Sequence, residues 1–114
     1  MYQVINWSES VRLHFGDVTL PKLLPAWNDL KLHLSIGSKV SGPVVLKAPF
    51  GVWLDLGVRF PAILLITRFK DPFNYDNYVE HGPQLGDHLD AIVYLFNDVD
   101  RQLVLTQKPL EETA

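Results

Sequence analysis

The stretch FGVWLDLG, residues 50–57, is the clearest strand pattern in this chain of 114 residues. It is rich in aromatic, β-branched and aliphatic side chains, which favour strands, and Gly57 marks its exit. Similar short apolar segments lie on both sides of it and alternate with clusters of Gly, Pro, Asn and Asp. The stretch is therefore predicted to be one strand of a sheet that extends in both directions along the chain.

The other strands are predicted at residues 39–47, 60–69, 88–96 and 102–107. Residues 62–66 form a continuous apolar run, which is typical of a strand covered on both faces, and Pro61 favours a strand over a helix there. Gly42 and Pro43 mark either an edge position or a bulge in the first strand, because proline cannot donate to a ladder.

A long polar and aromatic connection, DPFNYDNYVEHGPQLG, separates the third and fourth strands and is expected to hold one helical turn around Tyr78. Five short strands with one long connection at this place suit a small closed barrel. We therefore predict an all-β fold, a five-stranded Greek-key barrel of the OB type, over residues 36–109, with a C-terminal tail at residues 110–114.

Residues 1–35 look like an appended N-terminal module. Residues 11–15 and 18–20 are strand-like runs separated by Gly16 and Asp17, which predicts a tight hairpin. Residues 25–29 could open a helix with Pro25 in its first turn, but Leu30, Leu32, Leu34 and Ile36 alternate with polar residues. The preferred prediction is a short turn followed by a strand, so that the module forms a β extension packed on the barrel.

Composition limits the class of protein. The chain is 47% apolar and 20% charged, with a net charge of -3, which is the profile of one compact domain rather than a disordered chain. It has no cysteine for a disulfide, no apolar run of bilayer length and no secretory signal, so we expect a cytoplasmic protein without membrane contact. The acidic balance argues against a tight, purely electrostatic nucleic-acid binder.

The barrel region resembles the S1 RNA-binding domain family in four elements. They are IGSKVSGPV at residues 36–44, FGVWLDLG at 50–57, LGDHL at 85–89 and RQLVLT at 101–106. Their order and spacing agree with the family over about 70 residues. The resemblance implies an S1-like OB-fold that binds single-stranded RNA.

The resemblance implies a binding face around Phe50 and Trp53. Because the two residues lie three apart, a bulge at Gly51 is expected to bring both rings to one face. There they offer two stacking platforms for bases, and the alternative is that either ring is half-buried under the N-terminal module. Phosphate partners are sought among the few cations of the region, namely Lys47, Arg68, Lys70 and Arg101.

Several positions depart from the family pattern. Leu65 stands where RNA-binding members carry a His, and the family's Asp before the last strand corresponds to Asn97 or Asp98. The family's Arg falls on Arg101 or Gln102, depending on where one extra loop residue is placed. Residues 36–109 hold 7 Lys and Arg against 8 Asp and Glu, which predicts weak binding.

An aliphatic Leu65 on this face needs a cover, which a partner protein, a second copy or the N-terminal module could supply; we favour the module. Its apolar residues exceed what a 35-residue appendage buries against itself: Trp7, Leu13, Phe15, Leu23, Leu24 and Trp27. The predicted barrel core follows strand alternation and apolar runs: Val40, Val44, Val52, Leu54, Leu56, Ile63, Leu89, Ala91, Val93, Leu103 and Leu105.

No pattern indicates catalysis. His81 and His88 lack helical metal-ligand spacing, Asp98 and Asp100 fit a tight strand connection, and no phosphate-binding glycine loop or nucleophile elbow is present. We expect no enzyme, metal or cofactor. Two functions stay open: weak binding of single-stranded RNA through Lys47, Phe50, Trp53, Arg68, Asp98 and Arg101, or a protein-binding module that kept the barrel and lost RNA binding. The sequence leaves the oligomeric state open.

Overall fold

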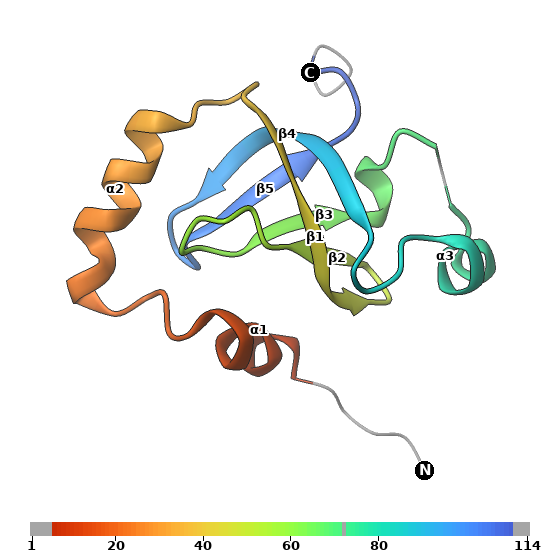
Figure 1. Cartoon of the computed structure of the whole chain (residues 1–114), viewed down its shortest axis with the longest axis horizontal. Helices are drawn as coiled ribbons and strands as arrows, with labels where there is room; N and C mark the ends of the chain where they lie inside the picture. Colours follow the sequence, from red (N-terminus) through yellow and green to blue (C-terminus); the bar gives the residue numbers. More distant parts are fainter. Residues whose placement is uncertain (1–5, 72, 111–114) are drawn as a thin grey trace.

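The computed structural model of the chain describes residues 6–71 and 73–110 and contains a closed barrel. Its strands are β1 (Lys39–Ala48), β2 (Gly51–Leu54), β3 (Ala62–Leu65), β4 (His88–Asn97) and β5 (Gln102–Thr106). They close in the order β1-β2-β3-β5-β4, with every pair antiparallel except β3 and β5. The predicted five-stranded OB-fold barrel is confirmed, and Figure 1 shows it between helices at either end.

The barrel core consists of the inward side chains of alternate strand positions. Val44, Val52, Leu54, Val93 and Leu103 are almost completely buried, as their alternation predicts. Ala91 and Leu105 are buried with them, whereas Val40, Leu56, Ile63 and Leu89 are only partly buried. The third strand is shorter than predicted, because the backbone turns into the 3₁₀-helix η2 (Ile66–Arg68) after Leu65.

Two glycines allow neighbouring strands to approach closely. A Cβ at Gly42 would lie 2.2 Å from the carbonyl oxygen of Asp55, and one at Gly51 would lie 2.6 Å from that of Leu64. Pro43 pairs with His88 of β4 without interrupting the ladder. The bulge of β1 falls between Val44 and Leu46, one step beyond these residues.

The helix α3 (Tyr75–His81) interrupts the long connection between β3 and β4, where one helical turn was predicted. Asn74 caps its N-terminus by accepting from Asn77 N at 2.8 Å. The hydroxyl of Tyr78 lies 2.5 Å from the carbonyl oxygen of Ala48 and 2.9 Å from that of Gly51, and burial raises the pKa of Tyr78 to about 12. The helix is thus tied to the turn between β1 and β2.

The N-terminal module is helical, so the predicted β extension is wrong. Residues 11–15 belong to α1 (Trp7–Phe15) and not to a hairpin. Asn6 caps this helix by accepting from Glu9 N at 3.1 Å, and Trp7, Val11 and Phe15 recur every four residues on one face. The alternation that suggested a strand is coincidental, since Leu13 is 81% exposed.

The second segment forms α2 (Leu24–His33), preceded by the 3₁₀-helix η1 (Pro21–Leu23). Pro25 lies in the first turn of this helix. The helix is the alternative that the sequence left open, and the preferred prediction of a turn and a strand is wrong. Trp27 and Leu30 face the barrel, whereas Leu32 is 83% exposed. The helical spacing of Trp27, Leu30 and Leu34 therefore indicated the observed structure, and the alternation of the leucines did not.

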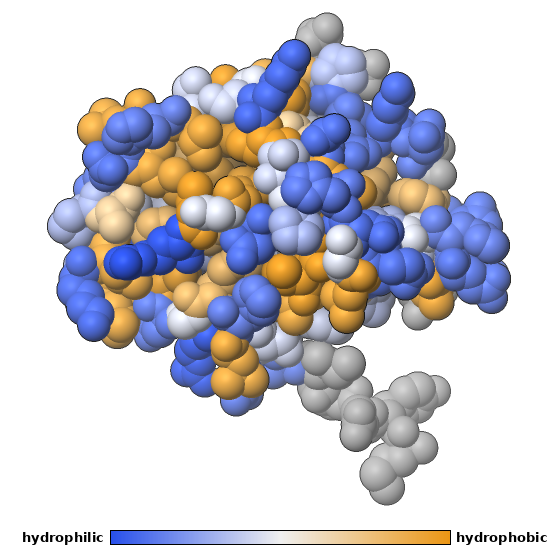
Figure 2. Space-filling view, in the orientation of Figure 1, coloured by the Kyte–Doolittle hydropathy of each residue, from blue (hydrophilic) through white to orange (hydrophobic). Residues whose placement is uncertain are grey.

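In Figure 1, α2 lies to the left of the barrel, α1 lies below it and α3 lies to its right. Trp27 is 1% exposed and belongs to the barrel's own hydrophobic cluster, with its ring centroid 5.0 Å from that of Phe60 and 5.8 Å from that of Phe96. Figure 2 shows hydrophobic residues gathered over α2 and the adjoining barrel, and hydrophilic residues over α3. Within the described ranges, no helix combines the length and apolar character that a membrane crossing requires.

Candidate nucleic-acid interface

Phe50 and Trp53 share one face of the barrel, with ring centroids 5.7 Å apart and planes at 81°. The predicted cause is wrong, because Gly51 pairs regularly with Ala48 and carries no bulge. Phe50 instead lies in the turn between β1 and β2, which frees its ring from strand alternation. Trp53 sits within β2, between Leu46 of β1 and Ile63 of β3.

The helix α1 covers this aromatic pair with Trp7. The indole of Trp7 stacks on Trp53 at 6.0 Å with an interplanar angle of 28°, and its centroid lies 6.3 Å from that of Phe50 in an edge arrangement. Trp53 is 4% exposed and donates from Nε1 to Gln102 Oε1 at 3.2 Å, whereas Phe50 keeps 40% exposure. Trp7 therefore packs on the ring of Trp53 and leaves Trp53 almost fully buried.

Lys47 is directed toward α3. Its Nζ donates to the backbone carbonyl oxygen of Tyr78 at 2.9 Å and lies 4.7 Å from the centre of the Tyr78 ring. Desolvation lowers the pKa of Lys47, and the charge of Asp87 opposes that shift. The ammonium group is thus held in an intramolecular contact.

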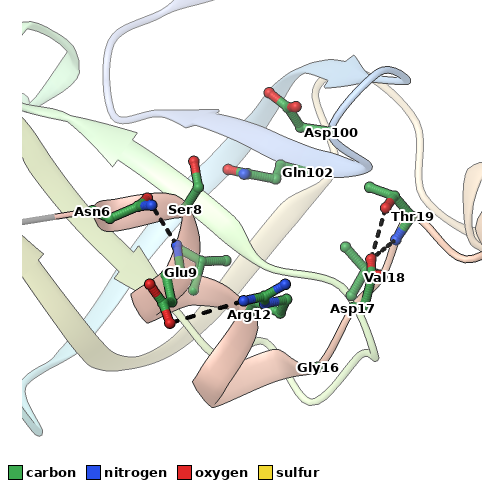
Figure 3. A pocket seen from close by; sticks show the side chains of 11 residues that line it. Asn6, Ser8, Glu9, Arg12, Gly16, Asp17, Val18, Thr19, Asp100 and Gln102 are labelled. Atoms are coloured by element: carbon green, nitrogen blue, oxygen red, sulfur yellow. Dashed lines mark hydrogen bonds and ion pairs between the residues drawn. The ribbon is translucent and has the colours of Figure 1, made fainter.

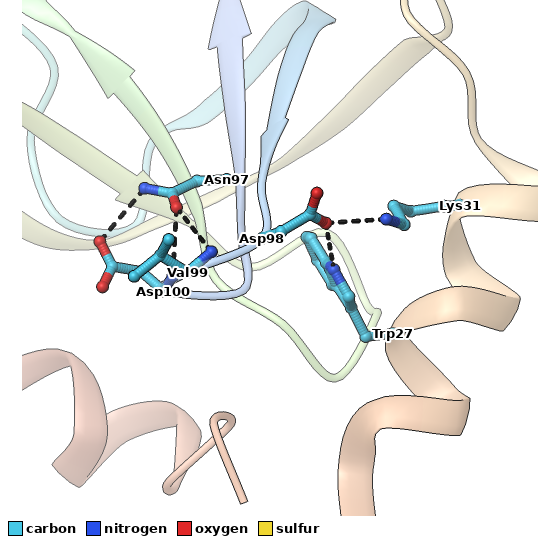
Figure 4. A network of polar contacts seen from close by, with 6 residues as sticks. All are labelled: Trp27, Lys31, Asn97, Asp98, Val99 and Asp100. Carbon is cyan, nitrogen blue, oxygen red and sulfur yellow. Dashed lines mark hydrogen bonds and ion pairs between the residues drawn. The ribbon is translucent and has the colours of Figure 1, made fainter. Parts of the chain in front are cut away.

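Asp98 and Arg101 bind the N-terminal module. Asp98 Oδ1 accepts from Trp27 Nε1 at 2.8 Å and from Lys31 Nζ at 2.7 Å (Figure 4). The hydrogen bond from Lys31 has the larger effect and that from Trp27 the smaller, and both lower the pKa of the Asp98 carboxyl group. Arg101 donates from Nη1 to the carbonyl oxygens of Val18 and Leu20, at 3.1 and 2.7 Å.

The two pairs of candidate residues, Asn97 with Asp98 and Arg101 with Gln102, make different contacts. Asn97 folds back onto its own loop, accepting from the backbone N of Val99 and of Asp100, each at 3.1 Å. Asp98 is the loop residue whose carboxylate contacts α2. Arg101, whose φ is 53°, is the residue whose guanidinium contacts the linker before α2. Gln102 contacts Trp53 instead. Both ionic positions are therefore occupied by contacts to residues 18–31.

Arg68 lies apart from these residues. It ends η2 and its guanidinium carbon sits 4.3 Å from the centre of the Tyr94 ring. Its Nε and Nη2 are buried and have no acceptor among the described residues. The structure therefore groups Phe50 with Trp53, and Asp98 with Arg101 along the N-terminal module, while Lys47 and Arg68 are directed to other neighbours.

A hollow of about 360 Å³ lies between α1, the linker after it and the start of β5 (Figure 3). Among the described residues, three carboxylates line this hollow, those of Glu9, Asp17 and Asp100, together with the guanidinium of Arg12. Arg12 Nη2 lies 3.9 Å from Glu9 Oε1. Thr19 donates to Asp17 from its backbone N and its hydroxyl, and these bonds lower the pKa of Asp17. This excess of acid repels a phosphate backbone. No cluster of His, Asp and Glu suited to a metal ion occurs in residues 6–71 and 73–110.

The sequence patterns assigned no role at this interface to three residues, Trp7, Trp27 and Tyr78. The two tryptophans belong to the apolar excess that predicted a cover, but no local pattern indicated which ring meets Trp53. Leu65, the departure that called for the cover, pairs with Gly51 and is partly buried. Helical spacing of Trp7, Val11 and Phe15 is the signal that could have identified α1.

The barrel is similar to several solved structures. GSP13 from Bacillus subtilis matches with 18% identity and a TM-score of 0.55, over 71% of this chain and 59% of GSP13. A putative exosome complex RNA-binding protein matches with 23% identity and a TM-score of 0.57, over 67% of this chain and 44% of that one. RNase R of Mycoplasma genitalium, in complex with ribose-methylated single-stranded RNA, matches with 19% identity and a TM-score of 0.55, over 75% of this chain and 14% of the enzyme.

The chain thus spans less than two thirds of each of these proteins. At these identities the likeness establishes the fold alone, in agreement with the predicted OB-fold barrel. No protein-family model and no curated protein sequence matches the chain.

Proposed function

We propose that this protein binds single-stranded RNA weakly through the face that carries Phe50 and Trp53, and that α1 covers part of this face in the free protein. The observation that carries the proposal is the stacking of Trp7 on Trp53, 6.0 Å away, beside a Phe50 ring that is still partly exposed. The arrangement is that of a base-stacking platform occupied by an aromatic ring of the same chain. RNA complexes among proteins of this fold, such as that of RNase R, support the proposal.

Weak affinity follows from the cover. When only a fraction of molecules exposes the binding surface, the apparent dissociation constant rises by the inverse of that fraction. Lys47, Asp98 and Arg101 are also engaged in internal hydrogen bonds, so RNA must compete with them. Phe50 is the residue of the face that RNA reaches without rearrangement.

A titration of fluorescently labelled oligouridylate against the Trp7→Ala and Phe50→Ala variants tests this function. Removal of the Trp7 ring should tighten binding severalfold, because the platform on Trp53 becomes accessible. Removal of the Phe50 ring should weaken binding by about 1 to 3 kcal/mol, the usual contribution of one base–aromatic stack. Leu13→Ala is the matched control on the same helix, since Leu13 is exposed and should leave affinity unchanged. Unchanged affinity in both ring variants would contradict the proposal.

The second candidate is a protein-binding module, an accessory, inhibitor or assembly subunit, that kept the barrel and lost RNA binding. The internal engagement of Asp98 and Arg101 by residues 18–31 favours it, because both ionic groups of the face stabilise the fold instead. Failure of both the wild-type protein and Trp7→Ala to bind any RNA at low salt would select this candidate. The cytoplasmic location and the absence of catalysis stay predictions under either function.

A further inference from the structure

The cations that the sequence offered as phosphate partners divide into two groups in the structure. Lys47 donates to a backbone carbonyl of α3, and Arg101 donates to two backbone carbonyls of the linker between α1 and α2. Arg68 and Lys70 lie at and just after η2, beyond the end of β3. A groove of about 780 Å³ opens beside them, which we call the β1–β4–β5 groove.

The β1–β4–β5 groove is lined by the start of β1, the start of β4, the end of β5 and the segment after η2. Three lysines, Lys39, Lys70 and Lys108, line it together with two carboxylates, Asp71 and Asp90. Within residues 6–71 and 73–110, the three ammonium groups form no ion pair and no hydrogen bond with other side chains or backbone carbonyls. In this part of the chain, no ion pair neutralises the three charges.

Gln107 holds the walls of this groove in a fixed relation. Its Oε1 accepts from the backbone N of Lys70 at 3.1 Å, and its Nε2 donates to the carbonyl oxygen of Asp90 at 2.9 Å. Its backbone N donates to the carbonyl oxygen of Arg68 at 2.8 Å. Gln107 thus joins β4, the segment after η2 and the residue that follows β5, so the backbone of these three walls is held in one arrangement.

Arg68 lies two residues before Lys70, and its side chain is not part of the groove lining. Its guanidinium stacks on Tyr94, and its buried Nε and Nη2 have no acceptor in the described part of the chain. Because these two donors are buried, they do not reach an external ligand, and among the described residues the three lysines are the cations that line the groove.

We propose that the β1–β4–β5 groove binds the phosphodiester backbone of a single-stranded nucleic acid through Lys39, Lys70 and Lys108. The contacts are ionic and independent of the bases, and the two carboxylates keep the affinity moderate. The groove is separate from Phe50 and Trp53, so it extends the binding surface of the protein beyond the aromatic face.

An abasic deoxyribose-phosphate oligomer is the sharpest probe, because it presents phosphates and has no base to stack on Phe50 or Trp53. The full chain should bind it at low salt, and the double variant Lys39→Gln with Lys108→Gln should weaken binding about tenfold. The log-log slope of affinity against salt should fall by about 1.4, since each single-strand phosphate contact contributes about 0.7. The charge-preserving pair Lys39→Arg with Lys108→Arg should restore binding.

The double variant Lys22→Gln with Arg59→Gln is the matched control, because it removes the same charge from exposed positions outside the groove. An equal loss in the control, or no binding of the abasic oligomer by the wild-type chain, would overturn the proposal. Displacement by inorganic phosphate at equal phosphate concentration would also overturn it in favour of a free-phosphate site. Phe50→Ala should leave the abasic oligomer bound and weaken only oligouridylate, which separates the groove from the aromatic face.

Discussion

At the scale of single residues, the aromatic cluster of Trp7, Phe50 and Trp53 connects packing with binding. Trp53 makes its indole hydrogen bond to Gln102 and its ring contacts to the other two aromatics while almost fully buried. A buried ring contributes both transfer free energy and packing to stability. In the free protein Trp53 therefore acts first as a stabilising residue.

Trp53→Ala should lower the free energy of unfolding by about 3 to 5 kcal/mol, as expected for truncation of a buried tryptophan. Urea denaturation followed by circular dichroism measures this loss. Phe50→Ala supplies the comparison, since Phe50 is 40% exposed and its truncation should cost much less. Equal small losses in the two variants would show that α1 does not bury Trp53 in solution.

At the scale of elements, Asp98 connects the β4–β5 loop to α2. A single carboxylate oxygen accepts from the Trp27 indole and the Lys31 ammonium, so the loop and the helix are positioned together (Figure 4). The adjoining residue Arg101 holds the linker between α1 and α2 by two backbone carbonyls. One short loop therefore anchors much of the N-terminal module.

The Asp98 contact should make docking of α2 sensitive to acid. A carboxyl group whose pKa is lowered in the folded state stabilises that state above its ordinary pKa, about 3.9, and loses this effect as pH falls through the lowered value. Wild-type protein should therefore lose more stability between pH 7 and pH 3 than Asp98→Asn does. Urea titrations at the two pH values, followed by tryptophan fluorescence, measure the difference.

Asp100→Asn is the matched control for this pH experiment. Asp100 accepts from Asn97 Nδ2 at 3.1 Å within its own loop and makes no contact with Trp27 or Lys31. Its variant should keep the acid sensitivity of the wild-type protein. The same sensitivity in Asp98→Asn would show that another group governs docking of α2.

At the scale of the whole molecule, we propose that residues 1–35 and the barrel at residues 36–109 form one cooperative unit. Trp27 shares a hydrophobic cluster with Phe60 and the barrel core, and Val18 of the linker belongs to the same cluster. α1 packs through a smaller cluster of Val11, Ala48 and Trp53. The module is thus part of the protein's interior more than an appendage to it.

Unfolding of the full chain should therefore be a single transition. Tryptophan fluorescence, which reports on Trp7, Trp27 and Trp53, and far-ultraviolet circular dichroism, which reports on the barrel and helices together, should give the same urea midpoint. Removal of residues 1–35 should lower that midpoint, because it uncovers Phe60 and Phe96. Two separate urea midpoints in the full chain would show that the N-terminal module and the barrel unfold independently.

The sequence by itself determined the barrel. Strand positions, the helical turn at Tyr78 and most of the core follow from alternation, glycine and proline boundaries and four short elements in register. These signals are local, because a strand's two faces and its ends are set by neighbouring residues. The shared face of Phe50 and Trp53 was predicted from a bulge at Gly51 that the structure lacks.

Only the tertiary structure decided the form of the N-terminal module and the state of the candidate site. Alternation at residues 11–15 and 30–36 competed with helical spacing, and contacts of Trp7 with Trp53 and of Trp27 with Phe60 selected the helices. Trp27 and Asp98 are 71 residues apart, and Arg101 reaches back 83 residues to Val18. Such contacts depend on how distant segments pack, so no local pattern determines which cations are held. Nor does one determine which cations, like those of the β1–β4–β5 groove, have no ion pair within the part of the chain that the structure describes.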